Sequence, residues 1–488
     1  MTSQCAQVVG NDWSALVPEP DASWTPHALV SICIPTRNPG PGLARTLRCL
    51  AAQTYPLDLI EVVIGDDGSD ADIEIPDGLP FPVRVERREH TLDFGAGRAR
   101  NTAGRAASGD ILFFLDGDVV PERDVVASYA RWFDRCELAA PMAICRFVDM
   151  EHLSDDELVT LVGAGDMAAA FAGADVDDQY WRELHFERTD DLRIERVDAF
   201  RVVVGATIAC SAEQFRRVGG FPELGVRGVE DTAFGYRLHN DGAVLILDRD
   251  ATHWHQGRRN LSDPGVRERI NEVRAPYVES VMPVRGFRLQ HPPTDPPVDV
   301  VPVARIRVSD HGGSEVAKRS LERLGSANLA LTDGPLDGSA DHAQLQVDLP
   351  DAVEWAEDTI ERIWELLAAR QVGVVRALVG GTDGLVVSIA RTRAITRVAQ
   401  IGVADAELMT AAGECFGVWW TDAASLGLVS PAPGDDSTGG ADRSRRGRFR
   451  SWRSVRVAGY RREVERRGGG VSSRLYDLVV SALRALTK

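Results

Sequence analysis

Two aspartates, Asp116 and Asp118, follow the apolar run at 111–115 and flank a single glycine. Paired carboxylates at the end of a strand suit a hard divalent cation, and the glycine lets a ligand approach the backbone. A cation held there would neutralise a diphosphate. Aspartate and glycine are also common turn residues after a strand, so the tripeptide alone is compatible with a simple turn. Its interpretation depends on the other polar residues of the chain.

A second acidic pair, Glu230 and Asp231, opens the segment "EDTAFGYRL", in which Phe234 and Leu238 have helical spacing. Backbone N–H groups at a helix start could help to hold a carboxylate, although acidic residues also simply favour this position. A transfer to a hydroxyl group in which phosphate leaves needs a base for the hydroxyl and a cation for the phosphates. The two acidic pairs together could meet both requirements.

The elements that would position these acids are three apolar runs, at 28–35, in "LIEVVIGDDGS" and at 111–115. They alternate with helix candidates, "GLARTLRCLAAQ" and "GAGRARNTAGRAASG", which predicts an α/β fold with mainly parallel strands buried on both faces. Ligands of such sheets bind beyond the carboxyl ends of the strands. The polar residues at these ends are Thr36, Arg37, Asn38, Asp66, Asp67, Asp116 and Asp118.

Composition and charge bound the class of protein. The chain has 488 residues, 44% hydrophobic and 26% charged, which predicts two globular domains with connecting segments. No apolar run could span a bilayer and the polar start is unlike a signal peptide, so we expect a cytoplasmic protein. The seven cysteines are scattered and lack a C-x-x-C pair. They therefore predict buried thiols, with neither a disulfide framework nor a zinc site.

The net charge of −18 is unevenly distributed, because residues 441–488 contain 14 Arg or Lys against 4 Asp or Glu. The acidic body excludes non-specific nucleic-acid binding. The basic tail also carries a stripe of apolar residues at helical spacing, too short to cross a membrane. It could lie on the anionic inner face of the plasma membrane or dock on another helix.

Five ordered motifs resemble family 2 glycosyltransferases of the GT-A fold over about residues 28–257. The motifs are "VSICIPTRN", "VVIGDDGSD", "GAGRARNTAGRAASGDILFFLDGDVVP", "GATIACSAEQFRRVGGFPE" and "GVEDTAFGYRLHNDG". The resemblance implies a nucleotide-diphospho-sugar donor, inversion at the anomeric carbon, and a divalent cation, Mn²⁺ or Mg²⁺. It also implies that Asp116 lies near the ribose and the metal, that Asp118 ligates the metal, that Asp231 is the base and that Glu230 positions the acceptor.

The same resemblance places Pro35, Thr36, Arg37 and Asp67 in the nucleotide pocket, with Asp67 facing the base. Asn38 and Asp66 accompany them at the strand ends, and Arg100 or Asn101 would help to close the pocket. Arg37 occupies a place where an aromatic residue is common in the family, which questions base stacking there, although a guanidinium plane can also stack.

The segment "DATHWHQGRR" places His253 and His255 on one side of an extended chain. A histidine after the acidic motif is a metal ligand in many GT-A enzymes. The resemblance therefore implies that one of the two completes the metal site, with His255 the slightly better candidate. Trp254 between them is a candidate platform for the acceptor.

Changes in composition divide the chain into six parts. They are an N-terminal extension at 1–27, a GT-A domain at 28–285, a Pro-rich linker at 286–300, a second α/β domain at 301–430, a flexible linker at 431–450 and a basic amphipathic tail at 451–488.

Segments of 301–430 resemble the first domain in order, which suggests a degenerate duplication of the GT-A unit. In this alignment Asp348 remains of the acidic pair, and Gly413 stands where the base would be. An unrelated α/β domain is the alternative.

These features predict an inverting, metal-dependent hexosyltransferase of family 2 that glycosylates a glycan, a glycolipid or another acceptor. Cell-envelope or polysaccharide biosynthesis would be its setting. Two alternatives remain open. A sugar-phosphate nucleotidylyltransferase would need a triphosphate donor, and a non-catalytic carbohydrate-binding protein would bind glycans without turnover.

Overall fold

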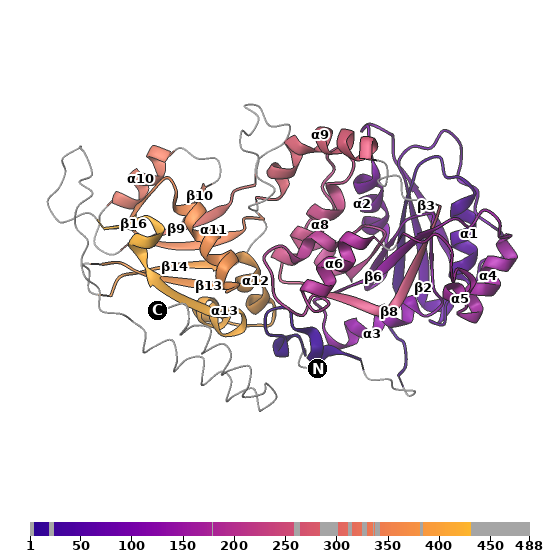
Figure 1. The fold of residues 1–488 in the computed structure, drawn as a ribbon, viewed down its shortest axis with the longest axis horizontal. Helices are drawn as coiled ribbons and strands as arrows, with labels where there is room; N and C mark the ends of the chain where they lie inside the picture. Colours follow the sequence, from indigo (N-terminus) through magenta and orange to yellow (C-terminus); the bar gives the residue numbers. More distant parts are fainter. Residues whose placement is uncertain are drawn as a thin grey trace. The chain divides into compact units, whose positions relative to one another are not determined.

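The computed structural model describes residues 4–18, 24–177, 179–257, 264–283, 301–310, 315–324, 329–334, 336, 342–380 and 384–430. They form two larger sheets with helices packed against them (Figure 1). Below, residues 4–283 are called the first region and residues 301–430 the second region. The predicted linkers at 286–300 and 431–450 and the basic tail at 451–488 lie outside the described residues.

The first sheet has eight strands in the order β3-β2-β1-β4-β7-β6-β8-β5. Its strands are β1 (Val30–Thr36), β2 (Ile60–Asp66), β3 (Val83–Arg87), β4 (Ile111–Leu115), β5 (Val119–Pro121), β6 (Ala139–Val148), β7 (Thr207–Ser211) and β8 (Val244–Gln256). Only β5 and β7 run against the others. The predicted α/β fold with a mainly parallel sheet is confirmed.

Helices of the first region cover both faces of this sheet. They are α1 (Pro41–Leu50), α2 (Ala96–Ala106), α3 (Val125–Arg135), α4 (Asp155–Ala164), α5 (Met167–Ala170), α6 (Tyr180–Arg188), α7 (Ala212–Arg217), α8 (Glu230–Asn240) and α9 (Pro264–Val281), with short 3-10 helices at Gln4–Gln7, Trp13–Leu16, Leu57–Leu59 and Ala199–Val202. The neighbours Phe113 and Phe114 in β4 belong to two separate hydrophobic clusters. Burial on both faces explains why β2 and β4 are uninterrupted buried runs.

The start of the chain is tied into the first region. The Asn11 side chain donates to the carbonyls of Leu192 and Leu245, at 2.7 and 2.8 Å, and accepts from the Leu245 N–H. Cys5 and Cys136 form a disulfide, with their Cα atoms 5.0 Å apart. The expectation of free thiols was therefore wrong for these two, because folding brings together residues 131 positions apart in the sequence. Cys33, Cys49, Cys145 and Cys210 are buried thiols as predicted.

The second sheet has six strands in the order β10-β9-β11-β14-β13-β15. They are β9 (Ala304–Ser309), β10 (Leu329–Thr332), β11 (Leu345–Pro350), β13 (Val374–Leu378), β14 (Val386–Arg391) and β15 (Val418–Asp422), and a small ladder joins β12 (Glu354–Trp355) to β16 (Leu428–Val429). The helices are α10 (Val316–Leu324), α11 (Thr359–Arg370), α12 (Thr392–Gln400) and α13 (Leu408–Phe416), with 3-10 helices at Asp405–Glu407 and Ala423–Leu426.

Six strands of the two sheets correspond in order and direction. The series β2-β1-β4-β7-β6-β8 and the series β10-β9-β11-β14-β13-β15 both pair as parallel, parallel, antiparallel, antiparallel, parallel. Within each series the strands also follow the same order along the chain. This shared topology agrees with a duplicated α/β unit.

Within the described part of the chain, no helix has the length and apolar character needed to cross a membrane.

Candidate active site

A cavity of about 1440 Å³ opens at the carboxyl ends of β1 and β4, where ligands bind in parallel sheets. It is bordered by the end of β1, the loop after β4, the first turns of α2 and α8, and the end of β8. One glycine helps to set the position of α2. A Cβ atom at Gly65 of β2 would lie 2.0 Å from the Ala99 carbonyl oxygen, so α2 can pack directly on the sheet. The carbonyl edge of the sheet thus gathers most of the predicted residues.

Asp67 forms one wall of the cavity. Its Oδ2 lies 2.8 Å from His90 Nδ1, and its backbone N–H donates to the Thr36 carbonyl at 2.9 Å. Its Oδ1 is buried and has no hydrogen-bond partner among the described residues. A Cβ atom at Gly95 would lie 1.8 Å from Asp67 Oδ2, so only glycine fits there. A buried acceptor without a donor, next to a cavity, can accept an N–H from a ligand.

The neighbouring predicted residues divide into two groups. Pro35, Thr36 and Arg37 line the cavity. Asn38 also borders it, but its side-chain amide is bonded to Asp70. Asp66 is absent from the lining, because its Oδ1 accepts from the Ser69 N–H and hydroxyl and its Oδ2 lies 2.8 Å from Arg87 Nε. Asp66 therefore shapes the loop and leaves Asp67 facing the cavity.

The adjacent residues Arg100 and Asn101 have different surroundings. Arg100 lines the cavity, donates to Asp116 Oδ1 at 2.8 Å and lies 3.7 Å from Glu230 Oε1. Burial by itself would lower the pKa of Arg100, but Asp116 and Glu230 outweigh it and raise the pKa. Asn101 is fully buried and bonded to the Phe221 backbone and to Glu223. Of the two, only Arg100 can reach a ligand.

Asp118 and His255 lie next to each other at the cavity, with Asp118 Oδ1 3.5 Å from His255 Nε2. The His255 ring stacks on Phe147 at 4.3 Å. Asp116 lies beside them, but its Oδ1 is bonded to Arg100. No three His, Cys, Asp or Glu side chains in the described ranges already form a metal cluster. Because Mn²⁺ and Mg²⁺ sites commonly include substrate phosphates and waters, a carboxylate and an imidazole are a fitting protein contribution.

His253 and Trp254 lie away from the cavity. His253 is fully buried against Phe113 and Tyr129, and burial lowers its pKa to about 3. Trp254 is buried on the other face of β8, where its Nε1 donates to Glu122 at 2.9 Å. These positions remove His253 from the candidate metal ligands and Trp254 from the acceptor residues, because neither side chain is accessible to a ligand.

The acid pair at the start of α8 borders the cavity next to Arg100. Glu230 is 6% exposed, and its Oε2 accepts from the N–H groups of Gly228 and Val229 at 2.8 and 3.0 Å. Asp231 is half-buried, and its Oδ1 accepts from the Thr232 N–H at 2.7 Å. Burial and the adjacent Asp231 raise the pKa of Glu230 to about 7, and burial also raises the pKa of Asp231. Asp231 is thus the more accessible of two weakly acidic carboxyls.

Several cavity residues lacked a recognisable signal in the sequence. Trp181 in α6 is 41% exposed and lines the cavity, as do His90, Phe147 and Arg227. Trp181 lies in a segment without a motif, so only the fold brings it to the site. No described residue beyond Met282 lines the cavity. The described part of the second region therefore provides no wall of this site.

Comparison with known proteins finds a family match within the first region. Residues 31–156 match the model described as "Glycosyl transferase family 2". The predicted family resemblance is confirmed for this segment. It contains Asp67, Arg100, Asp116 and Asp118, whereas Glu230, Asp231 and His255 lie beyond it.

The chain is also similar to curated proteins, among them enzymes named as glycosyltransferases. Chondroitin synthase from Escherichia coli is 27% identical over 334 residues, covering 64% of this chain and 47% of the relative. Pre-mycofactocin glycosyltransferase from Mycobacterium tuberculosis is 28% identical over 240 residues, covering 49% of this chain and 44% of the relative. The chain therefore spans about half the length of these curated relatives.

Among solved structures, the mannosyltransferase PcManGT from Pyrobaculum calidifontis in complex with GDP-Man and Mn²⁺ aligns with a TM-score of 0.33 and 19% identity. The alignment covers 50% of this chain and 63% of that chain.

Proposed function

We propose that this protein is an inverting, metal-dependent family 2 glycosyltransferase that moves a hexose from a nucleotide diphosphate to a hydroxyl of a glycan, a glycolipid or another acceptor. One observation supports this most directly. A buried carboxylate with an unpaired oxygen at Asp67, the Asp118–His255 pair and the acid pair of α8 all border a single cavity. A nucleotidyltransferase and a carbohydrate-binding protein would not need the last of these features.

In this proposal the unpaired Oδ1 of Asp67 accepts an N–H of the nucleotide base, and His90 holds the carboxylate in place. Asp118 and His255 hold a divalent cation, Mn²⁺ or Mg²⁺, which when bound neutralises the leaving diphosphate. Asp116 lies beside the ribose and keeps its contact with Arg100.

Asp231 is the proposed base because it is the more accessible acid. It takes the proton of the acceptor hydroxyl, whose oxygen then bonds to the anomeric carbon as the bond to the diphosphate oxygen breaks from the opposite side. Glu230 positions the acceptor, and Trp181 replaces Trp254 as the proposed platform for an acceptor ring, because it is exposed at the cavity.

Screening nucleotide sugars with the full-length protein and manganese tests this proposal. Release of nucleoside diphosphate that requires acceptor and is lost in Asp67→Asn and Asp231→Asn would support it. Release of pyrophosphate from a nucleoside triphosphate and a sugar phosphate would instead identify a nucleotidyltransferase. Glycan binding without turnover of any nucleotide sugar would identify a carbohydrate-binding protein.

Peripheral membrane contact through residues 451–488 remains a prediction from the sequence. Truncation after residue 440 should release the protein from anionic vesicles at low salt and leave activity on a soluble acceptor unchanged. Absence of vesicle binding by the full-length chain would contradict it.

A further inference from the structure

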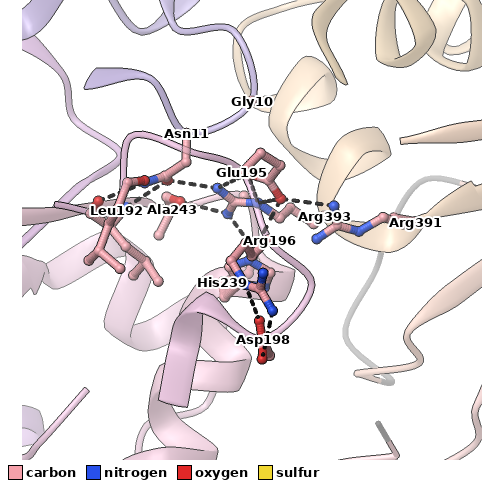
Figure 2. Close-up of polar contacts among 12 residues, drawn as sticks. Gly10, Asn11, Leu192, Glu195, Arg196, Asp198, His239, Ala243, Arg391 and Arg393 are labelled. Carbon is pink, nitrogen blue, oxygen red and sulfur yellow. Dashed lines mark hydrogen bonds and ion pairs between the residues drawn. The ribbon is translucent and has the colours of Figure 1, made fainter. Parts of the chain in front are cut away.

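The second region contacts the first at the far end of the helix that carries the acid pair. Strand β14 leads into α12, which places Arg393 and Arg397 against the last turn of α8 (Figure 2 draws Arg393 with its partners). Arg393 and Arg397 are 1% and 0% exposed. Two long cationic side chains are rarely buried this completely unless their donors are paired.

Both arginines donate to backbone carbonyls at the end of α8 and in the turn that follows it. Arg393 Nη1 donates to the carbonyl oxygens of His239 and Ala243 at 2.9 and 2.7 Å. Arg397 Nη2 donates to the Ala243 oxygen at 3.0 Å, and its Nε donates to the Gly242 oxygen. The last carbonyls of a helix lack partners within the helix. Arg393 therefore reaches a carbonyl in the last turn of α8, and both arginines hold the turn that joins α8 to β8.

The charges of this contact favour the same arrangement. Glu195 of the first region lies 2.8 Å from Arg391 and 3.2 Å from Arg393 (Figure 2). No carboxylate in the described part of the chain is within ion-pair distance of Arg397, and burial lowers its pKa to about 9. Glu195 pairs with two of the three guanidinium groups, and the unpaired positive charge of Arg397 lies near the negative end of the α8 dipole.

Further bonds from the second region hold the side of α8. The Tyr236 hydroxyl donates to the His342 carbonyl at 2.7 Å, and Asn240 Nδ2 donates to the Ala343 carbonyl at 2.9 Å. Gln400 Nε2 donates to the Asp241 carbonyl at 2.7 Å. These contacts, together with the arginines, link the last two turns of α8 to the residues before β11 and to α12.

The backbones also meet directly at this point. Gly242 follows α8 with φ +89°, and a Cβ atom there would lie 2.9 Å from Arg397 Cα. Glycine is required both by this left-handed conformation and by the close approach. There is no space at this point in which α8 could slide towards α12.

The other end of α8 is held within the first region. A Cβ atom at Gly97 of α2 would lie 3.2 Å from Glu230 Cβ, and Arg100 lies 3.7 Å from Glu230. Between the two ends, α8 is an uninterrupted helix of 11 residues. A hydrogen-bonded helix of this length moves as a unit, so a displacement at its end also displaces Glu230 and Asp231.

We infer that Arg393 and Arg397 are positioning residues, through which the second region fixes the acid pair of α8 in the cavity. The inference rests on the proposed function of Asp231 and Glu230. In this role the second region contributes to sugar transfer without having an active site. It does so by contacting the C-terminal end of α8, a helix of the first region.

The test compares Arg393→Gln and Arg397→Gln with Arg362→Gln. Arg362 pairs with Asp358 on the exposed side of α11, so this variant removes an arginine of the second region that does not touch α8. In the Arg393 and Arg397 variants, a displacement of the acid pair by a few tenths of an ångström to about 1 Å should lower kcat by roughly 10- to 100-fold. The KM and the affinity for the nucleotide sugar should stay within about twofold, since the donor contacts lie elsewhere.

Hydrogen exchange of the α8 amides is the second measurement. Exchange at 233–241 should accelerate in the Arg393 and Arg397 variants and stay unchanged in Arg362→Gln. If a glutamine variant does not fold, Tyr236→Phe removes only the bond to His342 and should give a smaller change in the same direction.

Folded variants with wild-type kcat would overturn the inference, as would kcat and donor affinity falling in parallel without faster exchange in α8. If the wild-type protein transfers no sugar from any donor, the proposed function fails. The exchange measurement alone then still decides whether α12 holds α8.

Discussion

The two sheets share strand order over six strands but differ in the residues that follow those strands. Ile111 of β4 and Leu345 of β11 are equivalent, because each begins its strand and pairs with the first residue of one neighbour and the last residue of the other. Counting from them, the positions of Asp116 and Asp118 correspond to Pro350 and Ala352. The second sheet therefore lacks counterparts of Asp116 and Asp118.

This register corrects the alignment made from the sequence. Asp348 is not the remnant of the acidic pair, because it lies inside β11, where its Oδ2 accepts from Arg307 at 3.0 Å. Gly413 is likewise in the interior of α13 and not at its start. The helix before β15 begins with Leu408 and Met409, whereas α8 begins with an acid pair.

The difference shows which parts of the unit can change independently. Strand pairing depends on backbone hydrogen bonds and on apolar side chains, for which many sequences suffice. The site depends on a few residues in the loops after the strands. The second sheet has the strand pairing of the first without the acids in its loops. The helix after β14 instead carries the arginines that contact the end of α8.

Removing Asp118, the carboxylate of the proposed cation site, would have the largest effect. Asp118→Ala should reduce transfer by about 1000-fold and abolish metal-dependent donor binding, because a bound cation contributes several kcal/mol to transition-state stabilisation. Asp348→Ala should change neither. Calorimetric titration with nucleotide sugar and manganese should give one site per chain, and a stoichiometry of two, halved in Asp348→Ala, would mean that the second sheet retains a site.

Breaking the ion pairs between the regions would have the next largest effect. Glu195→Gln should lower the free energy of unfolding at pH 7 by about 3 kcal/mol, because Arg391 and Arg393 lose their carboxylate while buried. Urea titration measures this. Glu213→Gln is the control, since Glu213 is 76% exposed beside Arg217 and should cost less than about 1 kcal/mol.

The difference in the free energy of unfolding between wild type and Glu195→Gln should depend on pH. Burial alone would raise the pKa of Glu195, but Arg393 and Arg391 outweigh it and hold the pKa below its usual range. The stabilisation is therefore present above the pKa of an unfolded glutamate, about 4.3, and is lost as the pH falls through the lower pKa of the folded state. The difference between wild type and Glu195→Gln should shrink below about pH 4. A difference that stays constant there would contradict the assigned charge on Glu195.

Loss of the proposed base would affect only the first region's chemistry. Asp231→Asn should lower kcat by about 100-fold or more and leave the affinity for donor and metal intact, which is typical of losing general base catalysis. Glu407→Gln, the acid directly before α13, should transfer sugar at the wild-type rate. Near-normal turnover in Asp231→Asn would remove Asp231 from the mechanism.

The smallest effect concerns Trp181 and Trp420, the two tryptophans that are exposed among the described residues, one in each region. Trp181→Ala should raise the KM for an acceptor about 10-fold through loss of ring contacts. Trp420 in β15 is 55% exposed but does not line the cavity, so Trp420→Ala should have no effect on this KM. Equal effects of the two variants would place part of the acceptor on the second sheet.

Local patterns in the sequence determined the elements and most of the cavity wall. The leucines at 43, 47 and 50 lie on the buried face of α1, and the predicted start of α8 is its first residue, Glu230. Such features follow from spacing along a single helix or strand, so they need no knowledge of distant residues. The strand ends brought Thr36, Asp67 and Asp118 to one edge for the same reason, since parallel strands share their carboxyl edge.

Only the tertiary structure shows which of two candidate residues close together in the sequence reaches the cavity. His255 reaches the cavity and His253 the core, although both lie on one side of β8, because the strand runs from the protein interior to the edge of the site. Arg100 and Asn101 point to different surroundings because adjacent positions on a helix diverge by about 100°.

The Cys5–Cys136 disulfide and the contact of α12 with α8 join residues more than 100 positions apart. No spacing rule predicts such pairs, because which surfaces meet is decided by the packing of complete sheets and helices. The sequence therefore located the acids that can do the chemistry, and only the packed chain decided which of them face the cavity and what holds them there.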